Sequence, residues 1–173
     1  DFSISRFLVP YLSGYRGWSL FLDSDMLVLG DIAEMANFAT LGHYYNTSVR
    51  VVQHDYIPRT ERKFLGQVQT KYGKKNWSSV MLFNNAKCTA LTPDVVARET
   101  GLFLHQFKWL SGDDQIGAIP TTWNYLVGEM TMPTTPRLIH YTLGGPYFDS
   151  YRECEYANLW FAEHALMNHA AKD

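Results

Sequence analysis

The chain has 173 residues, 46% of them hydrophobic and 18% charged, a globular composition that excludes an intrinsically disordered chain. A formal net charge of −2 provides no positive field and argues against nucleic acid as a partner. The two cysteines, Cys88 and Cys154, are too few for a disulfide framework and favour a reducing compartment, for which we expect the cytoplasm, and no apolar run reaches transmembrane length.

The first elements are a helix, a strand and a second apolar stretch. Apolar residues at three- and four-residue spacings predict a helix over residues 2–12, which Pro10 shortens or kinks. Residues 18–22 form an apolar run that predicts a buried strand. A second apolar stretch covers residues 26–29, and Asp31 after it is expected to cap a short helix.

Strands and helices continue to alternate through the middle of the chain. Residues 49–53 and 78–84 are the next two strand candidates. Thr92 and Pro93 open a helix as cap and first helical residue, and Gly101 is expected to close it.

The last third of the chain predicts two helices and one strand. Residues 113–118 suggest a short helix and residues 137–141 a strand. Ser150 and Glu153 form a capping box for a last helix with four inward-facing apolar residues. These are Tyr156, Leu159, Trp160 and Leu166. The alternation predicts an α/β sandwich in one domain over residues 1–173.

Carboxylates and a histidine follow two of the predicted strands. Asp23 and Asp25 come directly after the strand at residues 18–22, and His140 ends the strand at residues 137–141. Carboxylates two residues apart on a strand point to the same side, and a divalent cation offsets their repulsion. Two Asp and one His suit manganese, with positions left for substrate. A solvated turn and a core histidine are the alternative interpretations.

Two further polar segments have open interpretations. Asp114 and Gln115 come directly after Asp113. They are either the start of a helix, where the helix dipole favours acidic side chains, or groups that hold sugar hydroxyls beside a metal. Residues 59–75 carry six Lys or Arg and one Glu, either as a loop that faces phosphate or acceptor or as a solvated polar loop.

The ordered series of motifs resembles glycosyltransferase family 8, a retaining family with a glycosyltransferase A-type fold. The resemblance covers residues 2–147 and begins with an Arg on a helix, an apolar strand, an Asp-x-Asp and a Gly-Asp-Ile. It continues with an apolar strand ending in Asn, an acidic-Gln pair and a C-terminal His-Gly-Lys-Pro-Trp element. The matching residues are Arg6, Asp23, Asp25, Gly30, Asp31, Ile32, Asn84, Asp114, Gln115, His140, Gly144, Pro146 and Tyr147.

This resemblance implies a role for each matching group. Asp23, Asp25 and His140 would bind Mn²⁺ or Mg²⁺, which bridges the diphosphate of a UDP-sugar. Asp114 and Gln115 would be catalytic residues that face the donor sugar near its anomeric carbon. Donor binding would involve the two aspartates and four further residues: Arg6 at phosphate or donor sugar, Ser24 inside the Asp-x-Asp, and Gly144 and Gly145 at the diphosphate.

The chain departs from the family pattern in three respects. Gly145 stands where the family has Lys, and the spacing from His140 to Gly144 is one residue longer than usual. Only 22 residues precede Asp23, whereas a βαβ nucleotide-binding unit takes about 30 or more. The expected fold is therefore a three-layer α/β/α sandwich with a mixed sheet that lacks its N-terminal nucleotide-binding strands. The unpaired sheet edge would favour a homo-oligomer.

The functional expectation is a retaining hexosyltransferase that uses a UDP-sugar and a divalent metal. Its partners would be the nucleotide-sugar donor and a carbohydrate acceptor. A different class also fits the sequence, a non-catalytic remnant or binding module that keeps the fold without a complete donor pocket. A metal-dependent hydrolase using the same carboxylates is a third interpretation, although such sites usually carry clustered His ligands.

Overall fold

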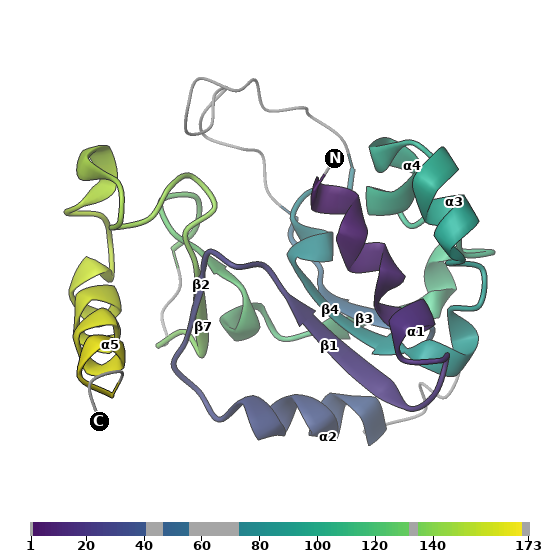
Figure 1. Ribbon diagram of the computed structural model, residues 1–173, viewed down its shortest axis with the longest axis horizontal. Coiled ribbons are helices and arrows are strands. Elements are labelled where there is room, and N and C mark those ends of the chain that lie inside the picture. The colour runs from purple at the N-terminus through teal and green to yellow at the C-terminus, as the bar shows by residue number, and fades with distance from the viewer. Residues whose placement is uncertain (1, 41–46, 56–72, 132–134, 171–173) are drawn as a thin grey trace.

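The computed structural model describes residues 2–40, 47–55, 73–131 and 135–170 (Figure 1). Its largest sheet has four strands in the order β1 (Trp18–Leu22), β4 (Val80–Asn84), β3 (Val49–Val52) and β5 (Ile116–Ile119). β4 is antiparallel to β1 and β3, and β3 is parallel to β5. β1, β3 and β5 therefore run in the same direction and end at the same edge of the sheet.

Alternating side chains of the central strands pack into two separate hydrophobic clusters, one on each face of the sheet. Met81 and Phe83 of β4 face one cluster, and Val80 and Leu82 face the other, as expected from the two-residue period of a strand. Both strands at the centre of the sheet are almost entirely buried, since β3 and β4 have apolar neighbours on each face.

Helices cover both faces of this sheet. One face holds the 3₁₀ helix η1 (Phe2–Leu8), α3 (Pro93–Arg98) and α4 (Gly101–His105), which share a core cluster with β3 and β4. The other face holds α2 (Met35–Thr40), and Figure 1 shows α2 across the sheet from the other three. The predicted α/β/α layering with a mixed sheet is confirmed.

A second, three-stranded sheet lies beside the first. Its order is β2 (Met26–Val28), β7 (Leu138–His140) and β6 (Tyr125–Leu126), with β2 antiparallel and β6 parallel to β7. The start of α5 (Ala157–Ala170) packs against it. The register places Met26 opposite His140, so the residues before β2 meet the end of β7.

Short helical turns make most of the remaining connections. α1 (Val9–Leu12) follows η1 directly and contains the predicted irregularity at Pro10. The other turns are 3₁₀ helices: η2 (Ile32–Glu34), η4 (Trp77–Ser79), η5 (Asn85–Lys87), η6 (Asp113–Gln115), η7 (Thr121–Trp123) and η8 (Asp149–Tyr151). Within the part of the chain described above, no helix combines the length and apolarity needed to cross a bilayer.

Two of the three predicted N-caps, Asp31 and Thr92, form. The Asp31 carboxylate accepts a hydrogen bond of 2.9 Å from the backbone N–H of Ala33 at the start of η2. Thr92 Oγ1 accepts one of 3.2 Å from Val95 at the start of α3. Each side chain satisfies a backbone donor that has no partner inside the helix.

Two helical segments differ from the prediction, and one strand is additional. Gly101 is the first residue of α4, because Thr100 caps a new helix and accepts from Phe103 N–H at 3.1 Å. The expected helix at 113–118 is a single 3₁₀ turn, η6, after which the chain pairs with β3 as β5. The two-residue strand β6 was not predicted.

The last helix also differs. Ser150 lies in the separate turn η8 and makes no capping box, and α5 begins seven residues later at Ala157. Leu159 and Trp160 pack inward as predicted, but Leu166 is 62% exposed because only the first turns of α5 reach the second sheet. The strand β1 is half-exposed rather than buried.

Candidate functional site

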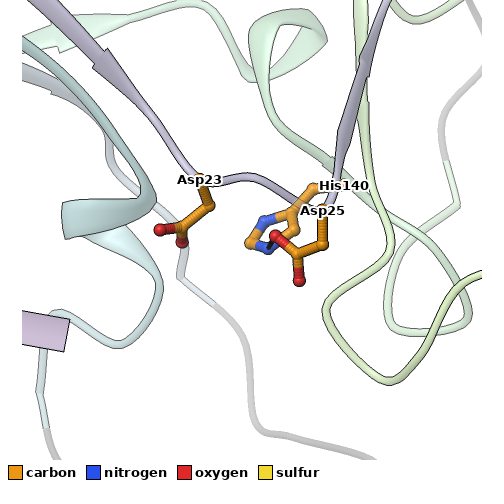
Figure 2. A group of neighbouring side chains, drawn as sticks. All are labelled: Asp23, Asp25 and His140. Atoms are coloured by element: carbon orange, nitrogen blue, oxygen red, sulfur yellow. Dashed lines mark ion pairs between the residues drawn. The ribbon is translucent and has the colours of Figure 1, made fainter. Parts of the chain in front are cut away.

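Asp23, Asp25 and His140 come together where the two sheets meet. Asp23 follows β1, Asp25 precedes β2, and His140 ends β7. One ligand atom from each residue lies within 4.8 Å of the others, so the three could hold a metal ion. Figure 2 shows the His140 ring next to the Asp25 side chain, with the Asp23 carboxylate to one side. The predicted clustering of these three residues is thus present in the structure.

The orientation of the His140 ring is set by Asn124. The Asn124 amide nitrogen donates to the carbonyl of Asn76 at 3.4 Å and to Ser79 Oγ at 2.8 Å. Its oxygen therefore faces Nδ1 of His140, 3.0 Å away, and accepts a hydrogen bond from it. This arrangement leaves Nε2 of the buried ring directed at Asp25 Oδ1, 3.3 Å away, with a lone pair for a metal.

Sequence reasoning did not identify Asn124 or Asn76. Asn124 follows the turn η7, and Asn76 adopts a left-handed backbone conformation with φ of 61° before η4. Neither residue stands in a metal-ligand motif, so no signal in the sequence marks them. Their role depends on the pairing of segments far apart in the chain.

Arg6 is held against Asp23 by three acceptors. One terminal nitrogen of Arg6 forms an ion pair of 2.7 Å with Asp23 Oδ1. The other donates to the carbonyl of Ser78 at 2.8 Å, and Nε donates to the carbonyl of Ser3 at 2.7 Å. The guanidinium therefore has a fixed position on one wall of the site.

The electrostatic environment of Asp23 is unfavourable to its charged form. Burial raises the pKa of Asp23, and the neighbouring Asp25 carboxylate adds to this effect. Arg6 and His140 act in the opposite direction without overcoming burial. A divalent cation at this point would favour the charged carboxylates, which is the expected behaviour of a metal site.

Two further histidines lie near the site and are neutral at neutral pH. Burial lowers the pKa of His105 to about 4, with a smaller contribution from Arg6. His105 Nδ1 lies 2.6 Å from Ser78 Oγ, so the ring supports the segment that binds Arg6. Burial also lowers the pKa of His54 to about 4, with a smaller effect of His140. Neither ring competes with Arg6 as the cation beside Asp23.

An open pocket of about 380 Å³ surrounds the three-residue cluster. Its wall is polar and charged over most of its extent, and aromatic at one side. The predicted residues Arg6 and Ser24 line it together with the cluster. The full lining is Arg6, Asp23, Ser24, Asp25, Asn76, His140, Thr142, Tyr147 and Phe148.

Asp114 and Gln115 lie elsewhere. The carbonyl of Gln115 accepts a hydrogen bond of 2.8 Å from Ser48 N–H. Ser48 is in turn hydrogen-bonded to Asn84, which pairs with the first residue of β1, so Gln115 lies level with the start of β1. Asp23 lies at the other end of β1. Asp114 and Gln115 line a separate pocket of about 410 Å³. The structure therefore does not place them beside the metal cluster, because they precede β5 whereas the cluster follows β1.

The two glycines after His140 are required by aromatic packing. Gly144 has φ of +140°, and a Cβ there would come within 2.6 Å of the Tyr151 ring. A Cβ on Gly145 would collide with the Tyr147 ring. Close approach of the backbone to a ring explains both positions in this structure. The expected approach of these glycines to a diphosphate stays a prediction.

Only the end of the basic segment 59–75 is described. Residues 59–72 lie outside the described residues, so the expected phosphate-facing or acceptor-facing loop is not tested. Lys74 Nζ forms an ion pair of 2.5 Å with Asp113 Oδ1 and donates to the carbonyl of Gln106 at 3.2 Å. These contacts tie Lys74 to the segment that precedes β5.

Comparison with known proteins finds a sequence relative and several solved structures with a similar fold. The chain is 46% identical over 170 residues to Protein CDI of Arabidopsis thaliana. The matched region covers 94% of this chain and 64% of that relative's length. No protein-family model matches the chain.

The similar solved structures are glycosyltransferases. GlyE of Streptococcus pneumoniae TIGR4 has a TM-score of 0.56 at 15% identity, covering 92% of this chain and 41% of GlyE. The bifunctional glycosyltransferase WbbM has a TM-score of 0.55 at 15% identity, covering 90% of this chain and 34% of WbbM. The chain therefore has a glycosyltransferase A-like α/β fold, as predicted.

Proposed function

We propose that this chain carries the metal-binding half of the active site of a glycosyltransferase that transfers a hexose from a UDP-sugar, with retention, to a carbohydrate acceptor. The observation that carries the proposal is the Asp23, Asp25 and His140 cluster, which lies in a pocket at the carboxyl end of β1. In open α/β sheets ligands bind at this edge. The fold shared with glycosyltransferases gives the cluster a matching context.

The donor atoms of the cluster fit a divalent transition metal. Asp23 and Asp25 supply oxygen, and His140 supplies a nitrogen lone pair at Nε2. Such a mixed set suits Mn²⁺, and Mg²⁺ is the second candidate because it accepts carboxylate ligands. When bound, the metal supplies Lewis-acid stabilisation of the charge on the diphosphate leaving group.

Arg6 supplies a positive charge from the protein at the wall of this pocket. Its guanidinium lines the pocket, and its contacts to Ser3, Ser78 and Asp23 fix its position. A fixed arginine neutralises phosphate charge without reorganisation during the reaction. Retention, the identity of UDP and a cytoplasmic location rest on the family resemblance and on cysteine use, and they are parts of the same proposal.

Calorimetric titration tests the proposal. UDP is titrated into the chain with and without Mn²⁺, and Mn²⁺ is titrated alone. We expect UDP binding that requires Mn²⁺, and we expect Asp25→Asn to weaken Mn²⁺ binding more than about tenfold, because it removes one of three ligands. Asp94→Asn is the matched control, since Asp94 is an exposed acid on α3.

Two results would count against this function. Equal Mn²⁺ affinity in Asp25→Asn and in the unchanged chain would show that the cluster is not the metal site. UDP binding that is independent of Mn²⁺ would show that the metal does not bridge protein and diphosphate.

A further inference from the structure

The aromatic side of the pocket is formed by Tyr147 and Phe148, in contrast to its otherwise polar lining. Tyr147 is 45% exposed although it lies next to the buried His140 region of the second sheet. A half-exposed aromatic ring at the wall of a charged pocket presents a flat apolar surface to whatever enters it. Tyrosine suits such a wall because its ring is apolar while its hydroxyl is polar.

The Tyr147 ring is held in place from several directions. Its centroid lies 4.7 Å from the Phe148 ring and 5.7 Å from the Trp160 ring on α5. Trp160 in turn stacks on His164, with centroids 5.0 Å apart. The ring also lies so close to Gly145 that any Cβ at that position would collide with it. The exposed surface of Tyr147 is therefore a fixed platform.

The platform is close to the metal cluster. Burial raises the pKa of Tyr147, and the negative charge of Asp25 raises it further, so the hydroxyl stays protonated at neutral pH. A group that contacted this ring would have Asp25, Thr142 and His140 as polar neighbours on the same pocket lining. One apolar face and several hydrogen-bonding groups at its edge are the combination that a sugar ring requires.

We propose that Tyr147 binds a pyranose ring by stacking, and that it thereby positions a sugar beside the Asp23, Asp25 and His140 cluster. This inference rests on the proposed function and adds a residue and a ligand class to it. The negative face of an aromatic ring attracts the C–H bonds on one face of a pyranose, while the sugar hydroxyls point to the polar lining. The sugar is either the hexose of the donor or the carbohydrate acceptor.

Three substitutions separate this role from a structural one. Tyr147→Leu removes the aromatic face, whereas Tyr147→Phe keeps it and removes only the hydroxyl. Gly145→Ala leaves Tyr147 in the sequence but displaces its ring, since the nearest atoms to the new methyl belong to that side chain. None of these changes removes a metal ligand, so calorimetric Mn²⁺ affinity serves as the control for folding and for the cluster.

The experiment is saturation-transfer difference NMR combined with calorimetry on the full chain with Mn²⁺. The probes are UDP, UDP-glucose, UDP-galactose, methyl glucoside and methyl galactoside. We expect Tyr147→Leu and Gly145→Ala to weaken binding of a hexose ring roughly three- to tenfold, with near-normal hexose binding in Tyr147→Phe. Mn²⁺ affinity is expected to stay unchanged in all three variants, and UDP affinity to stay unchanged in Tyr147→Leu. Loss confined to the UDP-hexoses assigns the platform to the donor, and loss confined to the methyl glycosides assigns it to the acceptor.

Three outcomes overturn the inference. Equal hexose signals in Tyr147→Leu and in the unchanged chain would show that the ring does not contact sugar. Mn²⁺-dependent UDP binding without any hexose contact in the unchanged chain would remove this inference and leave the proposed function standing. No binding of UDP with Mn²⁺ would contradict both.

Discussion

At the scale of single residues, Asn124 determines which nitrogen of His140 faces the carboxylates. Its amide nitrogen has acceptors in Asn76 and Ser79, so only its oxygen is directed at His140 Nδ1. The resulting hydrogen bond holds the imidazole in the tautomer with a lone pair on Nε2. Asn124, which is not a member of the candidate metal cluster, thus orients one of the candidate ligands.

We predict that Asn124→Ala weakens Mn²⁺ binding about 10- to 100-fold, because loss of the outer hydrogen bond frees the ring and its tautomer. Calorimetric titration of Mn²⁺ measures the change. Asn85→Ala is the matched control: Asn85 is also fully buried and donates to the Arg16 carbonyl and to Ser19 Oγ, at the other end of β1. Equal loss of Mn²⁺ affinity in both variants would show a general effect of destabilisation instead.

The metal cluster could be predicted from the sequence because each ligand stands at the end of an apolar run. Asp23 and Asp25 follow β1, and His140 ends β7, so strand recognition alone brings them to sheet edges. Asp114 and Gln115 have the same chemical character but precede β5. The sequence does not show which end of one strand lies beside which end of another, so it could not reveal that these two residues lie across the sheet from the cluster. Their expected role beside a donor sugar stays a prediction.

At the scale of elements, hydroxyl caps set the boundaries of two consecutive short helices. Thr92 caps α3 and Thr100 caps α4, each through a hydrogen bond to a backbone N–H three residues later. Gly101 fits the usual pattern of a helix end, but Thr100 before it is itself a cap, and a new helix starts there. Both helices bury a residue in the core that also holds η1, namely Val96 and Leu104.

We predict that Thr92→Ala lowers the free energy of unfolding by about 1 kcal/mol, because the N–H of Val95 loses its partner. Urea denaturation followed by circular dichroism measures the difference. Thr92→Ser keeps the hydroxyl and is expected to retain most of the stability. A loss in Thr92→Ser as large as that in Thr92→Ala would assign the effect to the methyl group of Thr92 rather than to the cap.

Strands were easier to predict than helices in this chain for a physical reason. β1, β3, β4 and β7 are short segments of three to five residues that are mostly apolar, which the sequence displays directly. Several helical segments are single 3₁₀ turns, too short to show a helical period. The strand β6 has two residues and exists through its pairing with β7, so local sequence does not reveal it.

At the scale of the whole molecule, β1 is the terminal strand of the four-stranded sheet among the residues that the structure describes. Its side chains are half-exposed, whereas those of β3 and β4 are buried. The sequence Trp-Ser-Leu-Phe-Leu contains no charge and no proline, the residues that normally protect an edge strand. Among residues 3–32, six large apolar side chains are also exposed. They are Tyr11, Leu12, Trp18, Val28, Leu29 and Ile32.

These features predict that the chain self-associates through the β1 edge, with a second copy pairing there. Light scattering over a concentration series is expected to show an average mass that rises above 19.9 kDa as concentration increases. Trp18→Lys places a charge at the start of β1 and is expected to shift the mass towards that of the monomer. Leu166→Lys is the control, since Leu166 is exposed on α5, which packs on the other sheet. A monomer mass for the unchanged chain at every concentration would contradict the prediction, and an equal effect of both substitutions would place the contact away from β1.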